Sequence, residues 1–401
     1  MAKDAVTRYV RSKHLEIESA ERDSVVVLHN QLGYRLLLNR ATQQFLELFD
    51  QPLSLEDLAA MGPLENAMPS FKKLRRARYL IEEGHAETAS DRLLTRVGRG
   101  LLGCPPASDA APPAAVTFLG VPFDCGNTVL PGARFGPAAL RRVSQTHFST
   151  YAVDSKTGKP RGWYDNDREA EILVGDTLAD AGDLFNAPNE APATLFAKLR
   201  EVAAGILETG SLPVILGGDH SVTFPVLAAF AEPLAIVQID AHTDLAEYFT
   251  GEEHHHGNFM SRALSLDQVT DVYQVGVRGT TLGPQAREGG KVRRTLTPRS
   301  LRREGVARFV AALPAESSYY VTFDIDALDP IHAPATSTPV PEGLSFGEVK
   351  DLLIGIAGSR RCVGFDLVEL NPQLDSRDLT AVVAIELLLA FLGAHCGRGG
   401  R

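Results

Sequence analysis

The sequence is poor in several residue types, and each shortage excludes a class of protein. Its 401 residues include one tryptophan and four cysteines, which are widely scattered: Cys104, Cys125, Cys362 and Cys396. They form neither a Cys-x-x-Cys pair nor a zinc-finger spacing, so a thiolate metal site is excluded and free thiols in a reducing compartment are expected. No uncharged apolar run reaches the roughly 18 residues of a membrane span, and the N-terminus lacks a signal-peptide core. We therefore predict a cytoplasmic protein with no membrane partner.

An excess of positive charge is also absent. The formal net charge is −10, so a surface that neutralises nucleic-acid phosphates is not expected. With 44% hydrophobic and 22% charged residues, the composition is that of an ordinary globular protein. The length exceeds the usual single-core size of about 250–300 residues, and this predicts two domains.

The composition changes between residues 86 and 114. The stretch GCPPASDAAPPAA at 103–115 is rich in Pro and Ala and has neither helical nor strand periodicity. We therefore predict a linker over 86–114, between a domain of residues 1–85 and a domain of residues 115–401.

Short apolar runs alternate with amphipathic segments through residues 115–401. This alternation predicts an α/β fold whose central parallel sheet is covered by helices on both faces. The predicted strands are 116–121, 172–174, 213–216, 234–239, 272–277, 319–323 and 362–365. In such sheets, functional sites lie at the carboxyl ends of the strands.

Residues 1–85 follow a different pattern. Strand-like runs at 15–17, 25–29 and 34–38 precede helical patterns at 40–49, 53–61 and 68–81. This order predicts a small α+β domain of winged-helix character.

Acidic and imidazole residues gather where three predicted strands end. The motifs are GGDH at 217–220, DAHTD at 240–244 and DID at 324–326. Buried carboxylates require cations, and the motifs contain neither Lys nor Arg. Residues i and i+2 of an extended strand point to the same side, so we expect these side chains to converge on bound cations. Carboxylates with one imidazole per metal suit Mn²⁺.

These motifs resemble those of the ureohydrolase (arginase/agmatinase) superfamily across residues 115–395. The matching segments, in the family's order, are GVPFDCGNTVLPGARFGPAALR (120–141), DAGD (180–183), GGDHS (217–221), DAHTDL (240–245), HHG (255–257), FDIDALDPIHAPATSTPVPEGLS (323–345) and DLVELNP (366–372). The resemblance implies a three-layer arginase-like fold and an enzyme that hydrolyses a guanidinium group to urea and an amine.

The resemblance also implies two Mn²⁺ ions per chain. The implied metal ligands are His220, Asp240, His242, Asp244, Asp324 and Asp326. Asp240 and Asp324 would bridge the two ions. A single-zinc deacetylase shares the architecture but uses fewer acids, so the pair Asp324 and Asp326 and the second histidine, His242, favour two metals.

Three residues are implied to act on the substrate. Two metals lower the pKa of water and supply hydroxide at neutral pH, and Asp244 would orient the hydroxide that attacks the guanidinium carbon. Glu369 would pair with the guanidinium, and His256 would protonate the leaving amine. His254 and His255 precede His256, so the register of this assignment depends on a run of three histidines.

The segment at 335–340 (ATSTPV) is closer to the arginase form of its motif than to the agmatinase form, which usually has Glu in place of Val340. Arginases that act on free arginine hold its charged head with polar residues. The matching positions here are Ala246, Gly279 and Thr281. An arginine within a peptide has amides instead of that charged head, so this pattern favours a peptide substrate.

Residues 15–84 resemble the PqqD-like leader-recognition element of enzymes that modify ribosomally made peptides. The resemblance implies that a leader peptide adds a strand at 34–38 or a neighbouring strand, with residues 71–79 facing it. Two alternatives remain open for the basic cluster of this domain, which comprises Lys72, Lys73, Arg75, Arg76 and Arg78. It is either a solvated helix face or the DNA-binding helix of a regulator.

We therefore predict a peptide arginase that converts arginine residues of a precursor peptide to ornithine and urea. One alternative is a small-molecule ureohydrolase acting on free arginine, agmatine or another guanidino compound. The other is a non-catalytic scaffold that binds a peptide or DNA. Relatives of this fold often form trimers or hexamers, so a homo-oligomer is compatible with the resemblance.

Overall fold

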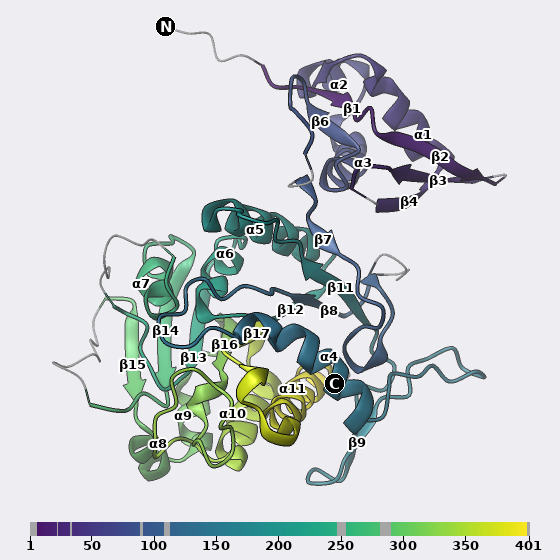
Figure 1. Ribbon diagram of the computed structural model, residues 1–401. Coiled ribbons are helices and arrows are strands. Elements are labelled where there is room, and N and C mark those ends of the chain that lie inside the picture. Colours follow the sequence, from purple (N-terminus) through teal and green to yellow (C-terminus); the bar gives the residue numbers. More distant parts are fainter. Residues whose placement is uncertain are drawn as a thin grey trace, which may run out of the picture. The chain divides into compact units, whose positions relative to one another are not determined.

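The computed structural model describes residues 6–21, 23–32, 34–88, 91–107, 113–246, 254–280 and 290–398. The chain divides into two compact units. Met1–Leu93 and Ala187–Glu190 form the N-terminal unit, and Leu94–Asn186 and Ala191–Arg401 form the large unit (Figure 1). Each unit is described by itself.

A nine-stranded sheet forms the centre of the large unit. Its strand order is β15-β14-β13-β16-β17-β12-β8-β11-β7. The strands are β7 (Leu94–Thr95), β8 (Val116–Gly120), β11 (Leu178–Leu184), β12 (Leu212–Leu216), β13 (Leu234–Ile239), β14 (Val269–Val275), β15 (Val292–Leu296), β16 (Ser318–Asp324) and β17 (Arg361–Val368). All neighbouring pairs are parallel except β11 and β7, which are antiparallel. The sheet is therefore mixed and mostly parallel, which corrects the prediction of a parallel sheet.

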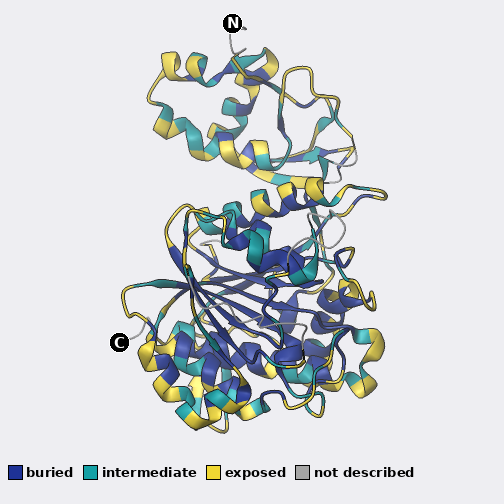
Figure 2. Ribbon diagram, turned by 90° about the vertical axis from the view of Figure 1, so that its left-hand side faces the viewer, coloured by how far each residue is buried: buried dark blue, intermediate teal, exposed yellow. Residues whose placement is uncertain are grey.

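Helices cover both faces of this sheet (Figure 1). On one face lie α5 (Pro192–Glu208), α6 (Thr223–Leu227) and α7 (Phe259–Ala263). On the other lie α4 (Gly136–His147), α8 (Pro298–Glu304), α9 (Val306–Ala312), α10 (Phe346–Ser359) and α11 (Leu379–Gly397). Every residue of β8, β12 and β13 is buried, as expected for strands enclosed between two helical layers (Figure 2). The large unit is thus the predicted three-layer α/β fold.

The predicted linker is largely part of the folded units. The N-terminal unit extends to Leu93, beyond the predicted boundary at residue 85. Glu87 accepts a hydrogen bond of 2.5 Å from the Ser12 hydroxyl, and β7 already belongs to the large sheet. Leu101 and Leu102 are fully buried in its core. Local composition hid these contacts because their partners lie far along the chain.

Helix α11 is long and apolar enough to cross a membrane by length and composition alone. However, 67% of its most apolar window is buried, and the helix packs on α4 and α10. These are the contacts of a core helix.

In its described residues, the N-terminal unit contains two small antiparallel sheets and three α-helices. One sheet has the order β2-β3-β4 and the other β5-β1-β6. The elements are β1 (Arg8–Arg11), β2 (Leu15–Ala20), β3 (Ser24–His29), β4 (Tyr34–Asn39), α1 (Arg40–Glu47), β5 (Leu53–Ser54), α2 (Leu55–Met61), α3 (Leu64–Arg76) and β6 (Leu80–Glu82). Leu80 and Ile81, predicted as the end of a helix, lie in β6 because they pair with β1. The winged-helix character remains a prediction.

Candidate metal centre

The predicted site residues lie at the carboxyl ends of four adjacent strands. In the order β13-β16-β17-β12, these ends carry Asp240, Asp324, Glu369 and His220. Their side chains are almost completely buried, with exposed fractions of 0%, 3%, 1% and 1% in that order. Parallel strands end at the same edge of the sheet, so residues more than 100 positions apart along the chain meet there.

The first ligand group surrounds the His220 imidazole. Its Nδ1 atom lies 3.1 Å from Oδ2 of Asp240 and 3.1 Å from Oδ2 of Asp244. Oδ2 of Asp324 lies 3.3 Å away. The opposite nitrogen, Nε2, is 2.7 Å from the Thr322 hydroxyl, and Phe259 stacks on the ring at a centroid distance of 4.1 Å.

The hydrogen bonds behind His220 assign its tautomer. Thr322 donates its hydroxyl proton to Asp366 over 2.6 Å, so its oxygen accepts the Nε2–H of His220. Nδ1 then faces three carboxylate oxygens. This buried nitrogen makes no hydrogen bond with the described residues. A cation between these four atoms satisfies all of them, so the residues fit a metal.

The second ligand group shares Asp240 with the first. His242 Nδ1 lies 3.0 Å from Oδ2 of Asp326 and 3.6 Å from Oδ1 of Asp240. Asp240, His242 and Asp326 each offer a ligand atom, all within 4.8 Å of one another. Asp240 therefore presents Oδ2 to one group and Oδ1 to the other. This geometry fits a binuclear metal centre with a bridging carboxylate.

The reason predicted for this convergence is wrong in detail. Strand β13 ends at Ile239, and the chain then turns, so Asp240, His242 and Asp244 do not alternate along a strand. Asp324 ends β16, and a 3-10 helix follows over Ile325–Ala327. As a result, Asp324 faces His220 whereas Asp326 faces His242. The side chains meet because the backbone bends and the carboxylates accept local amide hydrogens, as Asp324 does from Asp326 over 2.8 Å.

Both histidines have raised pKa values in the protein without metal. Burial lowers the pKa of His242, but Asp326 and Asp240 outweigh burial and raise it to about 12. Burial likewise opposes protonation of His220, and its three carboxylate neighbours raise the pKa well above the ordinary value. The carboxylates therefore attract positive charge to these two positions, whether as protons or as metal ions.

His256 lies beside this centre, and its ring nitrogens contact Glu369 and Thr128. Its Nδ1 is 3.1 Å from Oε1 of Glu369, and its Nε2 is 3.0 Å from the Thr128 hydroxyl. Burial lowers the pKa of His256, but the hydrogen bond and negative charge of Glu369 outweigh it, so the pKa is raised. The raised pKa favours the protonated imidazole, the form that can act as an acid.

The geometry distinguishes the three consecutive histidines. His255 turns back on its own loop, where Nδ1 accepts the Gly257 amide hydrogen over 2.9 Å. His254 Nδ1 lies 2.5 Å from Nη1 of Arg262, and its ring packs on Phe196. Of the three, His256 is the one beside Glu369.

Glu369 connects the metal ligands to the loop before α4. Its Oε1 accepts the His220 amide hydrogen over 2.9 Å, and its Oε2 accepts from Asn127 over 3.3 Å. Asn127 also donates to Ser337 over 3.0 Å. Asn127, Thr128 and Ser337 lie within the motifs that carry the family resemblance, but no role was predicted for them. Their contacts join loops far apart in the sequence, so no local pattern signals them.

Two of these side chains stand on a left-handed backbone. Asp244 has φ 50° and Glu369 has φ 64°. Residues other than glycine rarely adopt such values, and for Glu the conformation is costly. Strain of this kind persists where the surrounding contacts fix it, and it is common at functional sites.

Gly279 and Val340 lie near the backbone of Asp326, which Arg278 connects to Val340. A Cβ at Gly279 would lie 3.5 Å from Cγ1 of Val340, so these two residues are neighbours. Arg278, which precedes Gly279, hydrogen-bonds to the backbone: its Nη2 donates to the carbonyl oxygens of Asp326 (2.8 Å) and Val340 (2.7 Å). Ala246 is exposed, and Thr281 lies outside the described residues.

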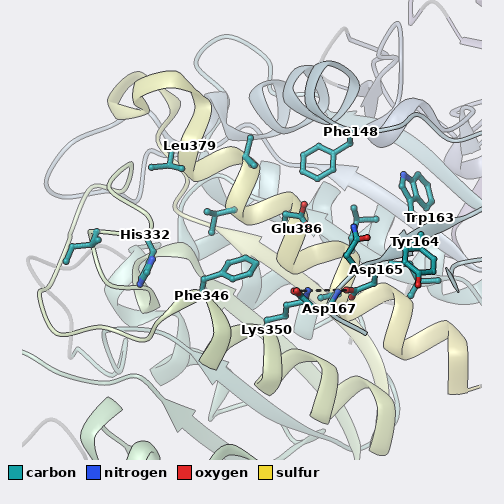
Figure 3. A pocket seen from close by; sticks show the side chains of 17 residues that line it. Phe148, Trp163, Tyr164, Asp165, Asp167, His332, Phe346, Lys350, Leu379 and Glu386 are labelled. Carbon is teal, nitrogen blue, oxygen red and sulfur yellow. Dashed lines mark hydrogen bonds and ion pairs between the residues drawn. The ribbon is translucent and has the colours of Figure 1, made fainter. Parts of the chain in front are cut away.

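A separate cavity of about 590 Å³ lies beside α10 and α11 (Figure 3). Phe148, Trp163 and Phe346 form its apolar walls, and Lys350 donates to Asp167 over 2.6 Å at its polar end. Its described lining residues include none of the ligands named above. This cavity is therefore not the predicted site.

Comparison with known proteins agrees with this geometry. Residues 114–393 match the Arginase family. Mitochondrial agmatinase of Gallus gallus is 33% identical over 304 residues, covering 72% of this chain and 83% of that protein. Proclavaminate amidinohydrolase of Streptomyces clavuligerus is 33% identical over 294 residues, covering 70% and 89%.

A solved structure gives the same result for the fold. The proclavaminate amidino hydrolase structure from Streptomyces clavuligerus aligns with a TM-score of 0.63 at 29% identity. The alignment covers 76% of this chain and 99% of that one. The chain therefore belongs to the arginase family of hydrolases that act on amidino groups.

Proposed function

We propose that this chain is a peptide arginase, which hydrolyses the guanidinium group of arginine residues in a ribosomally made precursor peptide. The products are urea and ornithine residues, and the resident metals are two Mn²⁺ ions per chain. The observation that carries this proposal is that Gly279 and Val340, neighbours near the backbone of Asp326, have no polar side chain. These residues offer nothing to the charged head of a free amino acid, whereas an arginine in a chain has neutral amides there.

The residues around the metal ligands have roles that follow from their contacts. Two divalent cations, when bound, lower the pKa of water and so supply a nucleophile at neutral pH. Asp244, at the rim of the first ligand group, orients that nucleophile toward the guanidinium carbon. Glu369 receives the guanidinium on its carboxylate, and the protonated His256 gives its proton to the leaving amine.

Two exposed apolar residues, which follow the Thr128 that contacts His256, support a large substrate. Val129 and Leu130 are 62% and 44% exposed, and they follow Asn127 and Thr128 directly. The Leu130 carbonyl accepts the Ser337 hydroxyl over 2.7 Å, so this loop is fastened beside the site. Apolar side chains in this position suit residues that flank a target arginine, and a small guanidine has nothing to place on them.

The N-terminal unit supports recognition of a leader peptide. Within the described part of the chain, β4 pairs with β3 and is otherwise an edge of its sheet. Leu37 in β4 is 63% exposed. An edge strand with an exposed apolar side chain is suited to take up an extended peptide as an added strand.

A second candidate is a small-molecule ureohydrolase. The names of the relatives favour it, since they include agmatinase, guanidino acid hydrolase and proclavaminate amidinohydrolase. In that case, the N-terminal unit would serve another purpose, such as assembly.

Urea release distinguishes the two candidates. The Mn²⁺-loaded chain is incubated with free arginine, with agmatine and with an arginine-containing peptide that carries the leader of a precursor encoded beside the enzyme. We expect urea from the peptide alone. Urea from arginine or agmatine alone would contradict the peptide proposal and establish the second candidate.

A further inference from the structure

Two buried glutamines lie in a row beside the bridging carboxylate. Gln238 and Gln274 both have an exposed fraction of 0%. They are direct cross-strand partners in β13 and β14, and Gln274 is in turn paired with Thr295 of β15. The three side chains therefore form a line across the strands that ends at Asp240.

The hydrogen bonds in this line have one direction. Thr295 donates its hydroxyl to Oε1 of Gln274 over 3.0 Å. Gln274 Nε2 donates to Oε1 of Gln238 over 2.7 Å and to the Thr243 carbonyl over 2.9 Å. Gln238 Nε2 donates to Oδ2 of Asp240 over 2.8 Å.

Only this direction satisfies every group. A carboxylate accepts hydrogen bonds and cannot donate them, so Gln238 must turn its NH₂ group toward Asp240. Its carbonyl oxygen then faces Gln274, which must also present an NH₂ group. If Gln274 were reversed, two carbonyl oxygens would meet in a buried environment, where an unpaired acceptor is costly.

We infer that Gln274, acting through Gln238, is a positioning residue that fixes the bridging orientation of Asp240. Gln238 occupies one side of Oδ2, which leaves its other side directed at His220, 3.1 Å away. Oδ1 accepts the His242 amide hydrogen over 2.6 Å and faces the second ligand group. Both donors are neutral, so the negative charge of Asp240 remains available to two cations.

The test uses the full chain and Mn²⁺ as the probe. Gln274→Met keeps the side-chain volume, does not touch Asp240 and removes the donor to Gln238. We expect it to weaken Mn²⁺ binding about 10-fold or more, as loss of a partner behind a metal ligand commonly does. The readouts are the dissociation constants of the two Mn²⁺ ions, from chelator competition, and the electron paramagnetic resonance spectrum of a spin-coupled Mn²⁺ pair.

Two further variants separate this role from general destabilisation. Thr117 lies in β8 of the same sheet and is not part of the line. Thr117→Val removes its buried hydrogen bond of 2.7 Å with Ser211 and should leave Mn²⁺ binding unchanged. Gln238→Met with Gln274→Met should bind Mn²⁺ no more weakly than Gln238→Met alone, because Gln274 acts through Gln238. Wild-type Mn²⁺ affinity in Gln274→Met, or independent effects that multiply in the double variant, would overturn the inference.

If Gln274→Met does not fold, Thr295→Val provides the same test from the partly exposed end of the line. It removes the hydroxyl that donates to Gln274, at the far end of the line from Asp240, so a smaller loss of Mn²⁺ affinity is expected, and an unchanged affinity counts against the inference.

Discussion

Glu369 raises the pKa of His256: the two side chains are 3.1 Å apart, and this contact outweighs the burial that would otherwise lower the pKa of the imidazole. Glu369→Gln removes the charge, so we expect the pKa of His256 to fall, with Asp244 and Asp219 still acting to raise it. Proton NMR titration of the metal-free protein measures this pKa directly. In the wild type, the acid form is lost only as the pH rises through the raised pKa, so activity should persist above pH 6.5 and decline on the alkaline side. An unchanged His256 pKa in Glu369→Gln would contradict this account.

The run of three histidines permits a matched comparison. His256→Asn removes the acid beside Glu369 and should lower kcat by about 10²–10⁴-fold. His255→Asn is the control, because an Asn oxygen can still accept the Gly257 amide hydrogen that the His255 ring accepts now. We expect kcat of this control to stay within about threefold of wild type. Equal losses in the two variants would show that the assignment is in the wrong register.

Asp240 is expected to be indispensable to both cations. Asp240→Asn keeps the shape of the side chain but removes the charge shared by the two ligand groups. We expect bound Mn²⁺ to fall from two ions to one or none, and urea release to fall by at least about 10³-fold. Metal analysis and a urea assay measure the two effects. Asp271→Asn, at a surface pair with Arg293, is the control and should change neither.

Metal binding should depend steeply on pH. Without metal, His242 with a pKa of about 12 and His220 with a raised pKa are protonated at neutral pH. Each must lose its proton to become a ligand, so affinity rises with pH by about tenfold per pH unit for each proton displaced. Calorimetry in buffers of different ionisation enthalpy counts these protons. If no proton is released, the histidines are neutral before metal arrives.

The N-terminal unit offers a matched pair of surface variants. Leu37 on β4 and Met61 on α2 are 63% and 62% exposed. Leu37→Glu should raise KM for a leader-bearing peptide about tenfold and leave the hydrolysis of a leaderless peptide unchanged. Met61→Glu should alter neither substrate. If KM for the leader-bearing peptide is the same in both variants and in the wild type, Leu37 on β4 does not take part in leader binding.

Strands enclosed by helices on both faces were predictable from sequence. The apolar run at 234–239 coincides with β13, and the predicted strands at 213–216 and 319–323 lie within β12 and β16. Burial on both faces requires a continuous apolar run, so local composition is sufficient for these strands.

Strands with charged residues were missed. β11 (LADAGDL) contains Asp180 and Asp183, whose charges are compensated by Arg141 at 2.8 Å and 2.5 Å. β15 contains two arginines, which suit the edge of the sheet. The predicted strand at 172–174 was wrong, because Ile172 ends β10 (Ala170–Ile172), which pairs with β9 (Trp163–Asp165) outside the large sheet. For β11 the deciding partner, Arg141, lies about 40 residues away in the sequence.

The residues of the site were likewise predictable from sequence only in part. The identities of the clustered acids and histidines were readable because strand-end carboxylates without nearby cations are conspicuous. Their distribution between two ligand groups was implied by the family resemblance and not by a local pattern, because it depends on the turn after Ile239 and on the 3-10 helix at Ile325–Ala327. The contact of Thr128 with His256 joins loops that no local pattern connects.

The left-handed backbone at Asp244 and Glu369 has a consequence for engineering. Glycine at either position would relieve roughly 1–2 kcal/mol of backbone strain while deleting a carboxylate that the chemistry needs. A library ranked only by heat resistance in a chelating buffer would therefore enrich inactive enzymes. Selection for stability therefore has to be coupled to selection for activity at these two positions, because the less strained glycine variants would lack a carboxylate that the reaction needs.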